Sequence, residues 1–123
     1  MEPYTTYSDD EKAIVRSGMP AIRAVLCGTD TEAKKRLLFC LDWFMDPYFG
    51  QDISAISDEL ELLLQSVIVS DNSMDVREDA IQLLTDYTWG PYPVLAAHLD
   101  EIDERLLPDV RYLIHECTPK QPE

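Results

Sequence analysis

Carboxylates are the most abundant groups in this chain that could do chemistry, and one run of them resembles a calcium-binding loop in its spacing. The run is Asp71-x-Ser73-x-Asp75-x-x-x-Asp79. It offers side-chain oxygens at several ligand positions, but Val76 stands where such a loop needs glycine, and Gln82 stands where it needs glutamate. We therefore expect a turn followed by a capped helix here, and no metal site.

Zinc ligands and catalytic motifs are also poorly represented. The two histidines and three cysteines form neither a Cys-x-x-Cys nor a His-x-x-x-His pair. The sequence has no phosphate-binding glycine loop and no Gly-x-Ser-x-Gly nucleophile motif. We expect no cofactor, no metal and no catalytic residue, with a hydrolase using paired carboxylates as an alternative. We expect all three cysteines to be reduced core residues in apolar helical patterns: Cys27, Cys40 and Cys117.

An acidic cluster near the C-terminus is the strongest candidate for binding. It consists of Asp100, Glu101, Asp103 and Glu104. Apolar residues with helical spacing lie between and beside these acids: Leu99, Ile102 and Leu106. Because those apolar residues mark the buried side of a helix, the acids are expected to face water and could bind a cationic partner. A solvated helix face with no partner is the alternative.

Net charge favours a basic partner over nucleic acid or an anionic membrane. The 123 residues carry 24 acids and 10 bases, a net charge of −14. Residues 51–123 contain sixteen of those acids and four of the bases, a net charge of −12. Nucleic acids and anionic membranes require a cationic surface. An acidic surface instead promotes solubility, or fast capture of a basic protein.

The elements that position these residues are repeated. The segment 37–48 matches the segment 81–92 at an offset of 44 residues, and the apolar positions that follow match at an offset of 46. The later pairs are Ile53/Leu99, Ile56/Ile102, Leu60/Leu106, Leu64/Val110 and Val67/Leu113. Their steps of three and four place each set on one face of a helix. A helical repeat of this length predicts an all-α fold of antiparallel hairpins, with about six or seven helices.

Capping and breaking residues set the expected boundaries. Ser8-x-x-Glu11 is a capping box, and Thr29-x-x-Glu32 is a second one. Asp75, followed three residues later by Glu78, is expected to cap another helix. The expected helices cover residues 8–17, 21–27, 33–44, 52–69, 76–88, 93–107 and 108–117. Together they form one domain, 1–123, in which residues 1–28 are N-terminal capping helices. The repeat copies cover approximately 29–69 and 73–117, and residues 118–123 form a flexible tail.

One motif resembles the second helix of HEAT repeats. The motif is Asp75-Val76-Arg77-x-x-Ala80-x-x-x-Leu84. In that family the aspartate and arginine bridge adjacent repeats, while alanine and leucine face the core. Pro108-Asp109-Val110-Arg111 partly repeats the motif, and the first copy departs from it. The resemblance implies a short right-handed HEAT-like array; an unrelated helical bundle is the alternative.

Aromatic residues at the repeated turns are candidate interface anchors. Pro47 and Pro91 make these turns rigid, and equivalent turns line up along one edge of a helical stack. The candidates for an exposed ridge are Tyr48, Trp89 and Tyr92. The alternative is that the rings cover the helix ends as part of the core, which is what we expect for Trp43 and Tyr87.

A small, acidic, helical-repeat chain is similar to the immunity proteins that bacteria keep beside secreted toxins. The resemblance rests on architecture, size and charge. It implies a protein that neutralises a basic, nuclease-type toxin domain by occluding its active site, with the acidic cluster for steering and the aromatic residues for anchoring. A general adaptor that binds a peptide or helix is the alternative.

The sequence also bears on localisation. The first ten residues lack the basic and apolar regions of a signal peptide, and no apolar run approaches the roughly 20 residues that span a bilayer. We expect a cytoplasmic protein.

Overall fold

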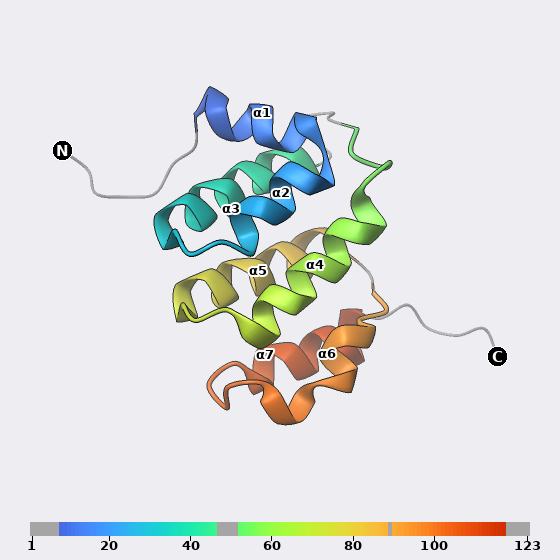
Figure 1. The fold of residues 1–123 in the computed structure, drawn as a ribbon. Helices are drawn as coiled ribbons and strands as arrows, with labels where there is room; N and C mark the ends of the chain where they lie inside the picture. Colours follow the sequence, from blue (N-terminus) through green and yellow to red (C-terminus); the bar gives the residue numbers. More distant parts are fainter. Residues whose placement is uncertain (1–7, 47–51, 89, 118–123) are drawn as a thin grey trace. The chain divides into compact units, whose positions relative to one another are not determined.

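The computed structural model describes residues 8–46, 52–88 and 90–117, and this part of the chain is helical without any β-strand (Figure 1). Seven α-helices occur in it: α1 (Asp9–Ser17), α2 (Met19–Leu26), α3 (Thr31–Met45), α4 (Ser57–Ser70), α5 (Met74–Tyr87), α6 (Pro93–Ala97) and α7 (Leu107–Tyr112). Two further short helices are η2 (Leu99–Glu101), a 3-10 helix, and η3 (Leu113–Cys117), a π-helix. The expected all-α class is confirmed. The expected tail at 118–123 lies outside the described residues.

The chain divides into two compact units, Met1–Leu60 and Glu61–Glu123, and the boundary falls within the first turns of α4. Within the described ranges, no helix is both long and apolar enough to cross a bilayer.

In the first unit, α2 and α3 run antiparallel and are joined by the short segment 27–30 (Figure 1). The unit is built on apolar residues from α1, α2 and α3 that are at most 5% exposed: Val15, Met19, Ile22, Leu26, Leu37, Leu38, Cys40, Leu41 and Phe44.

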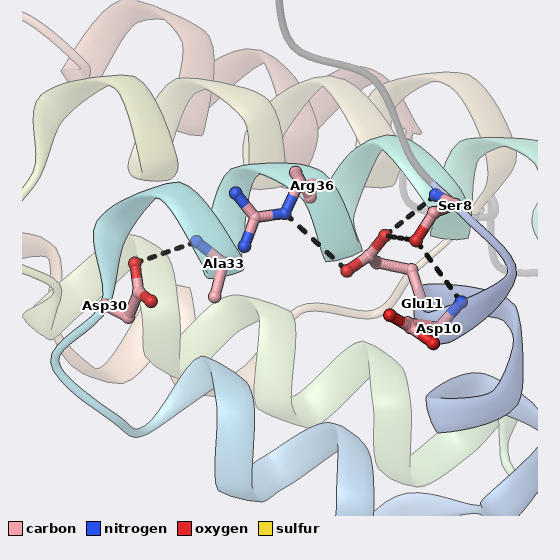
Figure 2. Close-up of polar contacts among 6 residues, drawn as sticks. All are labelled: Ser8, Asp10, Glu11, Asp30, Ala33 and Arg36. Atoms are coloured by element: carbon pink, nitrogen blue, oxygen red, sulfur yellow. Dashed lines mark hydrogen bonds and ion pairs between the residues drawn. The ribbon is translucent and has the colours of Figure 1, made fainter.

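Helix α1 begins at the capping box that the sequence predicts. The Ser8 hydroxyl accepts a hydrogen bond from Asp10 N (3.2 Å), and Glu11 Oε1 accepts from both Ser8 N and Ser8 Oγ, each at 2.8 Å (Figure 2). Arg36 of α3 places its Nε 3.6 Å from Glu11 Oε2. Burial alone would raise the pKa of Glu11, but the hydrogen bonds from Ser8 and the charge of Arg36 outweigh it and hold the pKa below 4.5. The cap therefore also joins α1 to α3.

Replacing Ser8 by alanine is expected to lower the free energy of unfolding by about 0.5–2 kcal/mol at neutral pH, because α1 loses its N-cap. The difference should shrink in acid. The folded pKa of Glu11 is depressed, so its stabilisation is present above the unfolded value of 4.5 and is lost as pH falls through the folded value. Denaturant titrations at pH 7 and pH 3 measure this. Ser17→Ala, at the exposed C-terminal end of α1, is the control; a Ser8→Ala effect equal at both pH values would contradict the argument.

Two expectations for the first unit are wrong. The N-cap of α3 is Asp30, whose side chain accepts from Ala33 N at 3.1 Å, so Thr29 is not the cap (Figure 2). Cys27 is exposed at the end of α2 and is not a core residue, whereas Cys40 is buried as expected. Burial raises the pKa of the Cys40 thiol to about 11, which keeps it protonated and unreactive.

Helix α4 begins later than its apolar pattern predicts. The chain before it forms a turn, in which Asp52 Oδ1 accepts from Ser54 N (3.0 Å) and Ser54 Oγ (2.7 Å). This local hydrogen bonding competes with helix formation, so the helix starts at Ser57 rather than at Asp52. Ile53 and Ile56 therefore precede the helix, although their spacing continues its periodicity.

In the second unit, α4 and α5 form an antiparallel hairpin around the turn at 71–73 (Figure 1). Ser73, rather than Asp75, is the N-cap of α5, and its hydroxyl accepts from Val76 N at 3.3 Å. The apolar residues at most 6% exposed from Glu61 onward are Leu63, Leu64, Val67, Ile68, Val76, Ala80, Ile81, Leu83, Leu84, Tyr92, Leu95, Ile102, Leu106, Val110 and Leu113. They come from both members of the hairpin and from the C-terminal segments.

The expected continuous helix over 93–107 is wrong. Helix α6 ends at Ala97, η2 follows, and Ile102 is extended with φ −79° and ψ 133°. Ile102 and Leu106 are nevertheless buried, because the turn that separates them returns the chain to the same core. Pro108 lies in the first turn of α7, as the sequence allows for a final helix.

Helix α6 receives its N-terminal cap from another helix. The residue preceding it, Tyr92, gives no side-chain cap. Gln65 of α4 is 1% exposed, and its Oε1 accepts from Val94 N (3.0 Å) and Leu95 N (3.3 Å). Its buried Nε2 has no hydrogen-bond partner among the described residues. Gln65 thus holds the start of α6, while its own buried Nε2 donor remains unsatisfied.

Candidate protein-binding surface

The acidic cluster of the sequence lies on η2 and on the turn that leads into α7. Ile102 and Leu106 are buried and hold this segment against the core of the second unit. Asp100, Glu101 and Glu104 are exposed, and Asp103 is partly exposed. The cluster therefore faces water, as expected, but it does so from a short 3-10 helix and a turn instead of a continuous helix.

Asp103 is committed to Arg105. Its Oδ1 accepts from Arg105 N at 2.9 Å and from Arg105 Nε at 3.1 Å, and its Oδ2 accepts from Arg105 Nη2 at 3.0 Å. Chiefly the side-chain hydrogen bonds of Arg105 lower the pKa of Asp103 to about 2. The pair fixes the turn before α7, and the negative charge of Asp103 is matched within the chain.

Glu101 also has a local partner, since its Oε2 contacts His98 Nδ1 at the end of α6. This contact becomes an ion pair when the imidazole is protonated. Asp100 and Glu104 differ from the other two acids: in the ranges described, neither forms a salt bridge or a side-chain hydrogen bond. Of the four residues, these two carry the least compensated charge.

Arg105 connects the acidic turn with α5. Its pKa is raised first by the hydrogen bonds and charge of Asp103 and then by the charges of Glu104 and Glu78. Glu78 lies in the second turn of α5. The charge of Arg105 therefore interacts with acids of the turn at 103–105 and with an acid in the N-terminal part of α5.

The predicted aromatic ridge is not present at Tyr92. The Tyr92 side chain is 3% exposed, and its hydroxyl lies 2.8 Å from Thr88 Oγ1, so it is a core residue and leaves the candidate surface. Tyr48 and Trp89 lie outside the described residues. Among the described residues of the second unit, Tyr112 on α7 is an exposed aromatic residue, at 52% exposure. In sequence, Tyr112 lies between the buried positions Val110 and Leu113. Because it falls outside this apolar stripe, its exposure could have been predicted from the sequence.

The calcium-loop spacing at Asp71 has a structural explanation. Asp71 is 8% exposed, and its Oδ1 accepts from Ser73 N at 2.8 Å. Arg77 Nε donates to the carbonyl oxygen of Asp71 and ties the start of α5 to this turn. Over the described ranges, no group of three or more His, Cys, Asp or Glu side chains is arranged to hold a metal ion.

The chain matches no family model, no curated protein and no solved structure.

Proposed function

We propose that the protein acts by binding, and that it neutralises a basic protein partner, a nuclease-type toxin domain, by covering the partner's cationic active site. The charge of the second unit carries this proposal: residues 61–123 contain thirteen acids and four bases, a net charge of −9. A concentrated negative surface accelerates encounter with a cationic cleft and disfavours partners of like charge. Asp100 and Glu104 contribute most within the cluster, because Asp103 and Glu101 have partners in the chain.

A HEAT-like arrangement of the hairpins is the architectural part of the proposal. Helices α3 and α5 occupy corresponding ranges at the offset of 44 residues. Several pairs related by the repeat are buried in both copies: Leu37/Ile81, Cys40/Leu84, Leu60/Leu106, Leu64/Val110 and Val67/Leu113. Repeated hairpins with equivalent buried positions support a short solenoid, a class that presents surfaces to other macromolecules.

An adaptor that binds an apolar peptide is the second candidate. It is supported by Leu62 on α4, which is 45% exposed on a helix with an otherwise largely buried apolar stripe. An adaptor of this type predicts binding that changes little with salt, since apolar contacts are not screened.

The test of the proposed function is calorimetry and stopped-flow association with a specific partner. The partner is the C-terminal domain encoded by the reading frame immediately upstream, carrying an inactivating mutation. We expect nanomolar binding that weakens with salt. Asp100→Asn with Glu104→Gln should slow association about three- to tenfold at low salt, because long-range attraction is reduced.

The control for this test is Asp9→Asn with Asp10→Asn, which removes the same charge from exposed positions on α1. If both double variants slow association equally, net charge alone is responsible and the acidic surface of the second unit is not the contact. Absence of binding at micromolar concentrations contradicts the proposed function for this partner.

A further inference from the structure

A groove runs between α5 and α7 in the second unit. It has a volume of about 380 Å³ and is lined by Glu78, Ile81, Gln82, Thr85, Asp109 and Tyr112. The α5 residues are spaced by 3, 1 and 3, and the α7 residues by 3, so each set lies on one face of its helix. The volume is at the low end for small-ligand sites, which suits a single long side chain better than a larger molecule.

The polar groups of the groove are mainly hydrogen-bond acceptors. Thr85 Oγ1 donates its proton to Ile81 O (2.8 Å), so its oxygen is left to accept. Gln82 Nε2 donates one of its two protons to Asp86 Oδ2 (2.8 Å), so the amide still offers its oxygen as an acceptor and one N–H as a donor. The carboxylates of Glu78 and Asp109 only accept when ionised. A lining of this kind favours a cationic donor and disfavours an anion.

The apolar part of the groove suits a guanidinium in particular. Ile81 is 6% exposed and Tyr112 is 52% exposed, so a buried aliphatic contact and an accessible aromatic ring lie in one groove. A guanidinium is planar, stacks on aromatic rings and offers five donors, whereas an ammonium is a compact and strongly hydrated charge. The arginine stem can lie along apolar surface while its head meets the carboxylates.

Arg105 belongs to the same unit and its charge reaches the groove, but its guanidinium is already hydrogen-bonded elsewhere. Arg105 is within electrostatic range of Glu78, but its guanidinium makes hydrogen bonds to both oxygens of Asp103. Arg105 is not among the lining residues, so it contributes a nearby charge without occupying the groove.

We propose that the α5–α7 groove receives an arginine side chain of a basic protein partner, with the guanidinium stacked on Tyr112 and facing Glu78 and Asp109. This inference rests on the proposed function for the identity of the partner. The chemical preference of the groove is a property of the chain alone and can be measured without any partner.

The test is an NMR titration of the full chain with three small probes: N-acetyl-arginine amide, N-acetyl-lysine amide and N-acetyl-citrulline amide. Citrulline has nearly the shape of arginine without its charge. We expect shifts at Ile81, Thr85 and the Tyr112 ring with arginine, weaker binding of lysine by about three- to tenfold, and no localised response to citrulline. An equal response to citrulline, or no localised shift at tens of millimolar arginine probe, would overturn the assignment.

Matched variants separate the contributions to binding. Tyr112→Phe keeps the ring and should bind the arginine probe within about twofold of the unmodified chain, whereas Tyr112→Ala should weaken binding about three- to tenfold. Glu78→Gln with Asp109→Asn should abolish the localised response, and Asp9→Asn with Asp10→Asn should preserve it. Retained binding in the Tyr112→Ala variant would overturn the stacking role.

The two proposals can fail separately. If the arginine probe binds the groove and the upstream-encoded domain does not bind the chain, the groove assignment stands and the toxin partner is wrong. If the domain binds and the probe does not, the proposed function stands and the groove assignment is wrong.

Discussion

Replacing Leu84 by alanine is expected to lower the free energy of unfolding by about 2–5 kcal/mol. Leu84 is 0% exposed in α5, where it faces the core of the second unit. Truncation removes buried apolar surface and leaves a cavity that close-packed neighbours fill only in part. Urea titration monitored by circular dichroism measures the change from the shift of the midpoint at constant slope.

Leu62→Ala is the matched control, because it makes the same chemical change in the same unit at a position that is 45% exposed. We expect it to cost less than about 1 kcal/mol, since nearly half of the residue's surface is already in contact with water. Comparable losses in the two variants would show that Leu84 does not lie in a packed core.

Apolar periodicity predicted the core better than it predicted the helices. The later repeat pairs are buried in both copies at Leu60/Leu106 and Leu64/Val110. The segment 93–107 nevertheless contains two short helices and a turn, and the segment 52–56 is not helical. Spacing in steps of three and four requires only that side chains return to one core, and a turn can achieve that as well as a helix does.

Local hydrogen bonds explain most of the boundary errors. Asp52 and Asp103 each accept from the backbone N–H two residues later, a pattern that forms turns and delays the following helix. The caps at Asp30 and Ser73 each compete with a nearby residue of similar capping ability. Capping motifs therefore indicated the correct helices, but not which of two neighbouring residues caps each helix.

The sequence predicted the negative charge of the candidate surface but not its geometry. Composition identified an acidic C-terminal half, but it could not show that Arg105 matches Asp103. Nor could it show that α5 and α7 form a groove, because Glu78 and Tyr112 are far apart in sequence and meet only through tertiary packing. The aromatic ridge was wrong at Tyr92 because its hydroxyl finds a buried partner, Thr88.

Gln65→Leu is expected to lower the free energy of unfolding by about 1–3 kcal/mol, with its strongest effect on α6. The variant leaves Val94 N–H and Leu95 N–H without their acceptor, and an unsatisfied buried donor costs about 1–3 kcal/mol. Removal of the unpartnered Nε2 offsets part of this loss. Amide hydrogen exchange at Val94 and Leu95 should accelerate more than exchange in α5.

Gln65→Glu is the control for this prediction, because a carboxylate keeps an acceptor at the same place and removes the unpartnered nitrogen. Protection of Val94 and Leu95 should persist in it, even if the buried charge lowers global stability. Equal loss of protection in the two variants would show that the shape of Gln65, and not its acceptor, holds α6. The comparison isolates one hydrogen-bonded contact between residues about thirty positions apart.

The Gln65→Leu variant also separates long-range electrostatic attraction of the partner from short-range contact with it. Helix α6 leads directly into the acidic segment that begins at η2. Loosening of α6 should therefore make the position of Asp100 less well defined without changing the charge of the segment. Long-range attraction depends on charge more than on exact placement, whereas short-range contacts depend on both. We therefore expect Gln65→Leu to leave the association rate with the basic partner within about twofold and to speed dissociation. A slowed association with unchanged dissociation would mean that the acidic segment must be ordered before the partner arrives.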